Sequence, residues 1–126
     1  IIEYPSDVDR EVEVLLAKAL KQYPGGEEKL RKIVAGRVNL VKEVVRELRR
    51  IDRLAYGSAH LLSTLQILLA QLELKLSSGT PVEMVEGELP GLLRVAVESS
   101  LSITPLWDED LKRAVEEALD KVLTLR

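Results

Sequence analysis

The sequence predicts an all-α fold, a four- to five-helix antiparallel bundle with one long basic central helix, in a single domain over residues 1–126. Three observations predict it. Apolar residues recur with a helical period in every long segment. Stretches rich in Gly and Pro separate these segments, and none except Ile1–Tyr4 shows strand-like alternation. The composition, 46% hydrophobic and 31% charged, is that of a globular chain.

The first three helices follow from local signals. Residues 6–23 form the first, with Ser6 as a candidate cap, and the PGG at 24–26 ends it. The long basic helix runs from about residue 27 to residue 54. Gly57 permits a break before a third helix at 58–76, whose apolar face is a leucine series with a spacing of three and four residues.

The fourth helix is expected to start at TPVE (80–83), where Thr80 can cap and Pro81 fits the first turn. Pro90 within GELPG (87–91) lacks a backbone donor and crowds the preceding turn, so we expect an interruption there before the helix resumes to Leu101. A second TP at 104–105 signals the start of the last helix. Its apolar stripe comprises Leu111, Ala114, Val115, Ala118, Leu119 and Val122.

Charge is distributed unevenly along a chain whose net charge is −3. Residues 29–53 hold nine bases and three acids, whereas the segments before and after them are acidic. On a helical wheel the cations lie opposite the apolar arc, except Arg37, which either snorkels, pairs at an interface or marks a local bend. Carboxylates nearby in the sequence cannot neutralise this surplus, so the pattern predicts a cationic ridge that contacts a partner. The candidate partner-binding cations are Arg31, Lys42, Arg46, Arg49, Arg50 and Arg53.

The alternative for the ridge is a solvated helix face, stitched by pairs such as Glu27–Arg31, Glu28–Lys32 and Glu47–Arg50. A second candidate contact lies on the third helix, where Ile67 and Leu74 are apolar on the side away from the main leucine face. A helix that is apolar on two sides is either central in a bundle or in contact with a second chain.

No pattern points to catalysis or to a cofactor. The chain has no cysteine, and its single histidine, His60, has no companion ligands for a zinc site. We therefore expect a non-enzymatic protein without a metal, cofactor or small-molecule substrate, with His60 at a helix start and Trp107 as a packing anchor. Because no signal sequence or membrane-length apolar run is present, the expected location is cytoplasmic. The start at Ile1 without methionine indicates a processed product or a fragment.

Three stretches resemble, in order and pattern, the core of the archaeal ESCRT-III cell-division proteins: RKIVAGRVNLVKEVVR (31–46), LLSTLQILLAQLE (61–73) and SSLSITPLWDEDLKRAVEEAL (99–119). The resemblance covers about residues 9–123. It implies a subunit that polymerises on membranes through charged helical faces. The family's long first helix would have to precede Ile1. The segment RLAYGSAH (53–60) more faintly resembles the metal-binding helix of phosphate-uptake regulators, but Ala55 and Ala59 stand where carboxylates would be expected.

These observations predict a structural protein that forms homo-oligomers or polymers, as a membrane-remodelling filament does. Such contacts would bury the second apolar seam and pair the ridge with an acidic face, and an anionic membrane is a further candidate partner. One alternative is a nucleic-acid-wrapping coat protein of a hyperthermophilic virus, whose ridge contacts phosphates. Another is a designed bundle with a small-molecule site in a buried pocket around His60, Tyr56 and Asn39.

Overall fold

A computed structural model describes residues 5–105 and 107–123; Ile1–Tyr4, the segment with strand-like alternation, lies outside the described residues. The described residues form six α-helices packed together without a strand, which confirms the all-α prediction but exceeds the predicted count of four to five helices. The elements are α1 (Pro5–Leu20), α2 (Glu27–Ala35), α3 (Val38–Arg49), a 3₁₀ turn η1 (Asp52–Leu54), α4 (Ser58–Ser77), α5 (Val82–Leu101) and α6 (Glu109–Leu123).

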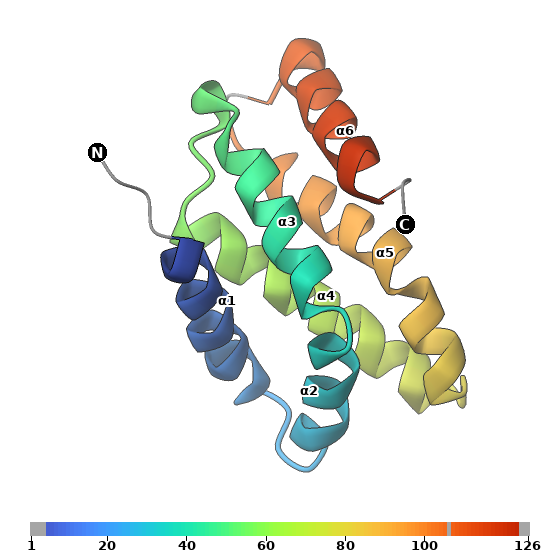
Figure 1. Cartoon of the computed structure of the whole chain (residues 1–126). Coiled ribbons are helices and arrows are strands. Elements are labelled where there is room, and N and C mark those ends of the chain that lie inside the picture. The colour runs from blue at the N-terminus through green and yellow to red at the C-terminus, as the bar shows by residue number, and fades with distance from the viewer. Residues whose placement is uncertain (1–4, 106, 124–126) are drawn as a thin grey trace.

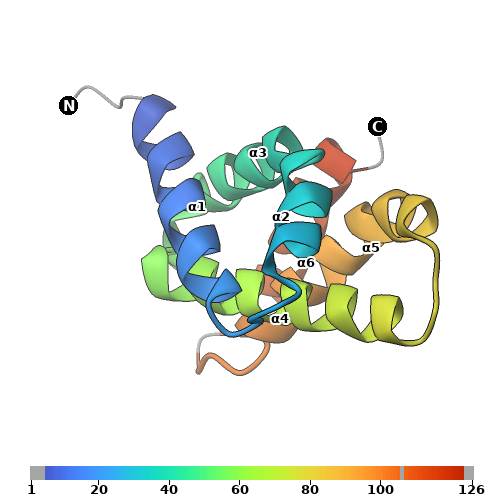
Figure 2. The same ribbon diagram turned by 90° about the horizontal axis from the view of Figure 1, so that it is seen from below.

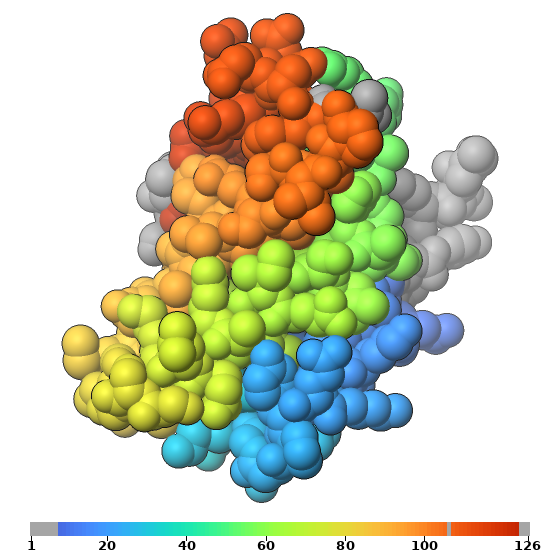
Figure 3. Space-filling view, turned by 180° about the vertical axis from the view of Figure 1, so that it is seen from behind, coloured from blue at the N-terminus to red at the C-terminus, as the bar shows by residue number. Residues whose placement is uncertain are grey.

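The helix α4 is the centre of the packing (Figure 1). α5 runs back along α4 to form a helical hairpin, and α1 packs against another side of α4. α3 packs on α1 and α6, while α2 contacts α1, α4 and α5. Figures 1 and 2 both place α1 and α5 on opposite sides of the molecule. On the face in Figure 3, α4 runs between the α1–α2 turn and the α5–α6 connection.

The core is aliphatic because the chain contains no phenylalanine. Its centre is the predicted leucine face of α4, where each fully buried leucine contributes about 1.5–3 kcal/mol. Val12 and Leu16 of α1 pack into the same core, as the helical period predicts, and the partly buried Trp107 packs against its edge. The α4 leucines with at most 1% of their surface exposed are Leu61, Leu65, Leu68, Leu69 and Leu72.

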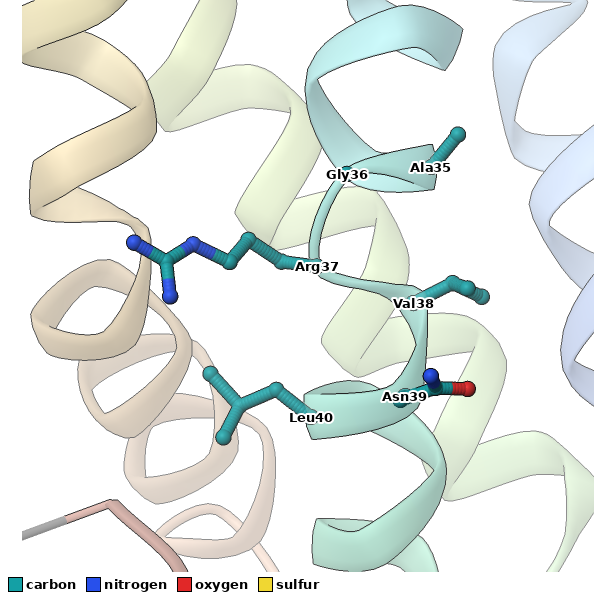
Figure 4. A pocket seen from close by; sticks show the side chains of 6 residues that line it. All are labelled: Ala35, Gly36, Arg37, Val38, Asn39 and Leu40. Carbon is teal, nitrogen blue, oxygen red and sulfur yellow. The ribbon is translucent and has the colours of Figure 1, made fainter. Parts of the chain in front are cut away.

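The prediction of one long basic helix is wrong, because the chain breaks between α2 and α3 at Gly36 and Arg37. Gly36 ends α2, and Arg37 leaves the helical region with φ −127° and ψ 21°. The break lets α2 pack on α4 and α5 while α3 packs on α6. Of the alternatives for Arg37, the local bend is confirmed. Its exposed side chain extends away from Val38 and Asn39 at the rim of a shallow pocket (Figure 4).

The prediction of an interruption at GELPG is also wrong, since α5 continues through Pro90. Proline removes one backbone hydrogen bond and crowds the preceding turn. Tertiary packing outweighs this cost, because Val85 and Leu89 before the proline and Leu93 and Val97 after it are all buried. A helix anchored on both sides of a proline by core contacts has little freedom to unwind there.

The caps differ from the predicted ones. α5 begins at Val82, and no side chain caps its N-terminus, so Thr80 does not have the expected role. α6 begins after Asp108, whose Oδ1 accepts a hydrogen bond from the backbone N–H of Leu111 at 2.8 Å. Asp108 therefore caps α6 in the manner of an N-cap carboxylate.

Candidate interaction surfaces

The predicted cationic ridge faces α1 over much of its length. Carboxylates on α1 project between the cations of α3, because α1 and α3 pack against each other. Lys42 is buried, although a lone buried ammonium would be costly, and its Nζ has two carboxylates within reach. The pairs are Arg46 Nη2–Asp9 Oδ1 at 2.8 Å, Arg49 Nη2–Glu11 at 2.8 Å, and Lys42 Nζ to Asp9 and Glu13 at 3.7 Å each.

The remaining ridge cations are also paired within the chain. Arg53 bonds to Asp108 at the start of α6. The predicted helical pairs Arg31–Glu27 and Arg50–Glu47 are present, with N–O distances of 3.0 and 3.3 Å. The expectation that the six ridge cations carry unneutralised charge is therefore wrong. Their role in partner binding stays a prediction, but its electrostatic premise is lost.

Two carboxylates in these pairs have lowered pKa values. Burial by itself would raise the pKa of Glu11, but hydrogen bonds from Ser58 and Arg49 and the charge of Arg49 outweigh it. The pKa of Asp108 is lowered by the hydrogen bond from the Leu111 N–H, and next by Arg53. The ionised carboxylates of Glu11 and Asp108 therefore stabilise the folded state.

The two apolar candidates have different environments. Ile67 is partly buried and packs against the core, as expected for a central helix. Leu74, near the C-terminal end of α4, has 71% of its surface exposed. Only Leu74 is therefore open to a second chain without rearrangement.

A buried polar cluster lies where α4 begins. The Tyr56 hydroxyl and Thr64 Oγ1 are 2.8 Å apart, Thr64 Oγ1 and Ser100 Oγ are 3.0 Å apart, and Ser100 donates to the carbonyl of Val97. Burial raises the pKa of Tyr56 to about 12. His60, in the first turn of α4 as expected, stacks on Tyr56 with ring centroids 5.7 Å apart. The cluster satisfies its own hydrogen bonds and ties α4 to α5, which is a structural role.

The alternative of a small-molecule pocket around His60, Tyr56 and Asn39 finds no support, because no pocket described within residues 5–105 and 107–123 brings the three together. Asn39 is exposed and lines the shallow pocket at the α2–α3 junction, whose wall contains neither Tyr56 nor His60. Within the described residues, no cluster of His, Cys, Asp and Glu could hold a metal ion. No described helix combines the length and apolarity needed to cross a membrane.

Charged side chains without a described hydrogen-bond or ion-pair partner separate by sign. On the described parts of α1, α2 and the turn between them, the unpaired bases are Arg10, Lys18, Lys21, Lys29 and Lys32, and the unpaired acid is Glu28. On α5 and α6 the surplus has the opposite sign. The acids are Glu83, Glu86, Glu98, Glu109, Asp110, Glu116 and Glu117, and the bases are Lys112 and Arg113. The six cations of the predicted ridge are thus paired within the chain. The unpaired charge is mainly positive on α1 and α2 and mainly negative on α5 and α6.

A shallow groove of about 430 Å³ is lined by Gly87, Glu88, Gly91, Leu92 and Val95 of α5 and, from α4, by Lys75, whose Nζ lies 3.3 Å from the Glu88 carboxylate. A Cβ atom added at Gly87 or Gly91 would meet no atom within 4 Å. Each glycine costs a helix interior about 1 kcal/mol relative to alanine. Met84 and Val95 flank the glycines with 58% and 46% of their surface exposed. The sequence did not single out this face, although two glycines four apart in a helix were a usable signal.

A scan with protein-family models finds no matching family, and no curated protein or solved structure matches the chain. The architecture and surfaces define the class as an all-α protein of packed helices, and the resemblance to the archaeal ESCRT-III proteins rests on sequence pattern alone.

Proposed function

We propose that the chain is a non-enzymatic structural subunit that assembles with copies of itself. One observation carries the proposal, namely that cations without described partners gather on α1 and α2 while such anions gather on α5 and α6. Because α1 and α5 lie on opposite sides of the molecule (Figure 2), one copy can present its positive side to the negative side of the next. A contact between two different faces repeats, and it builds rings or open filaments.

Exposed apolar side chains support the proposal, because charges set orientation and association rate while apolar burial supplies most of the affinity. Val14 is exposed on the positive side, and Met84 and Val95 are exposed on the negative side. Leu74, near the C-terminal end of α4, is a further exposed apolar side chain.

The ridge pairing weakens the nucleic-acid and anionic-membrane alternatives. Contact with phosphates requires Lys and Arg side chains that can leave their present partners, yet the six ridge cations already bind carboxylates of the same chain. The unpaired cations Arg10, Lys18, Lys21, Lys29 and Lys32 lie on α1, α2 and the turn between them, outside the predicted set of partner-binding cations.

Sedimentation velocity of the purified chain over a range of concentrations tests the proposal, at low and high salt. We expect species larger than a monomer that grow with protein concentration and shrink with added salt, since exposed charge pairs are screened. Parallel runs include duplex DNA and anionic liposomes. A monomer under every condition contradicts self-assembly, and assembly only on DNA or only on liposomes would favour that partner instead.

A further inference from the structure

The outer face of α1 is an exposed cationic strip, and its charged side chains have no described partner within the chain. Arg10, Val14, Ala17 and Lys18 are all exposed and lie about 180° from the buried face that contains Val12 and Leu16. Lys21, in the turn directly after α1, is exposed and extends the strip. None of the three cations has a described partner, and Val14 has 58% of its surface exposed at the middle of the strip.

The outer face of α5 has the complementary pattern. Met84, Gly87, Gly91 and Val95 form its centre, and Glu83 and Glu98, both without described partners, lie towards its ends. From Glu83 to Glu98 the face is about 22 Å long, and the α1 strip from Arg10 to Lys21 is about 16 Å long. Flexible Lys and Arg side chains span this difference.

Resting on the proposed self-assembly, we infer that the cationic strip of α1 docks into the glycine groove of α5 of the next copy. Val14 enters the space beside Gly87 and Gly91, where the absence of side chains allows close approach of the two helices. Arg10 and the two lysines then meet the carboxylates at the ends of the groove. The contact explains why α5 carries two glycines that nothing within the chain requires.

The contact joins two different faces, the α1 strip of one copy and the α5 groove of the next. The copy at each end of the assembly therefore keeps one of these faces free. α1 and α5 of one chain lie on opposite sides of the molecule, as Figures 1 and 2 show, so the strip of one chain does not occupy the groove of the same chain. Each added copy therefore presents a new α1 strip and a new α5 groove, as the growth of an open chain requires.

Charge-reversal variants test the contact. Lys18→Glu/Lys21→Glu reverses the strip, and Glu83→Lys/Glu98→Lys reverses the groove. Asp52→Lys, a charge reversal at an exposed site of η1 outside the α1–α2 and α5–α6 faces, is the control. We expect each of the first two variants to raise the concentration of half-assembly at least tenfold, and the control to change it less than threefold. An equimolar mixture of the strip and groove variants should assemble again, because each reversed face then meets its complement.

A groove-filling variant separates docking from folding. Gly91→Gln places a side chain in the groove and replaces a poor helix former with a good one. We expect a higher melting temperature together with loss of assembly, whereas Ser63→Gln on exposed α4 surface should leave assembly unchanged. If wild type assembles but the strip, groove and Gly91 variants assemble equally well, the contact is refuted and self-assembly stands. If wild type never leaves the monomer, the proposed function fails and the contact with it.

Discussion

The carboxylate of Glu11 joins three helices. From α1 it accepts hydrogen bonds from Arg49 of α3 and from Ser58 at the start of α4. The same arginine donates its Nε–H to the carbonyl of Tyr56 at 3.1 Å, so the cluster also holds the chain that leads into α4. Replacing Glu11 by Gln keeps the size of the side chain and removes its charge.

The expected loss follows from the contacts. Arg49 Nη2 lies 2.8 Å from the Glu11 carboxylate, and a hydrogen bond to a charged group contributes about 1.5–3 kcal/mol. Both side chains keep some contact with water, with 29% and 21% of their surfaces exposed, which screens the pair. We therefore expect Glu11→Gln to lower the free energy of unfolding by about 1.5 kcal/mol at pH 7, a fall in melting temperature of about 5 °C.

The loss should depend on pH with a definite sign. The pKa of Glu11 is lower in the folded chain than its ordinary value of 4.5, so its stabilising contribution is complete above that value. As pH falls through the lowered pKa, the folded carboxylate takes up a proton and the contribution disappears. Wild type and Glu11→Gln should therefore differ at pH 7 and converge at acid pH.

Urea denaturation followed by circular dichroism at a series of pH values from neutral to acid measures both effects. Glu13→Gln is the matched control, because Glu13 lies on the same helix with 69% of its side chain exposed and its carboxylate 3.7 Å from Lys42 Nζ. We expect the control to cost less than about 0.5 kcal/mol. Equal stability of Glu11→Gln and wild type at pH 7, or a difference that does not change with pH, would refute the reasoning.

Three further predictions concern the core and α5. Leu68→Ala should lower the free energy of unfolding by about 2–5 kcal/mol, because Leu68 is fully buried, whereas Leu74→Ala at an exposed site should change it by less than about 0.5 kcal/mol; urea midpoints measure both. Tyr56→Phe should cost about 1 kcal/mol at pH 7 and flatten the loss of wild-type stability above pH 10, where an unfolded tyrosine ionises and the folded Tyr56 does not; alkaline melts that remain parallel would contradict this. Pro90→Ala should raise the melting temperature by restoring a backbone donor inside α5, and a fall would show that the packing on α4 depends on the proline.

Much of the fold could be predicted because it depends on short-range patterns. The 3.6-residue period placed α1, α4 and α6 with their buried faces, and the PGG stretch lies in the turn that separates α1 from α2. The errors occurred where a local signal competed with packing. Gly36 alone did not predict the break between α2 and α3. Pro90 predicted a break in α5 that does not occur, because core contacts hold the helix on both sides of the proline.

The candidate surface was harder to predict, because a charge count does not say which charges meet. Arg46 and Asp9 are 37 residues apart in the sequence, Arg49 and Glu11 are 38 apart, and Arg53 and Asp108 are 55 apart. No helical wheel of one segment contains these pairs. The groove on α5 could not be predicted for the same reason. A pair of glycines in a helix forms an open groove only where no neighbouring side chain covers it, and the sequence does not show this.

The sequence by itself determined that this chain is helical, which faces of the helices now labelled α1, α4 and α6 are buried, and that it has neither cysteine nor more than one histidine. Those properties follow from residue type and spacing over a few turns. Only the tertiary structure decided which cations are neutralised and which remain available, since ion pairing acts between side chains that folding brings within a few ångströms. The surface open to a partner is what remains after that pairing, and here it lies on the outer faces of α1 and α5.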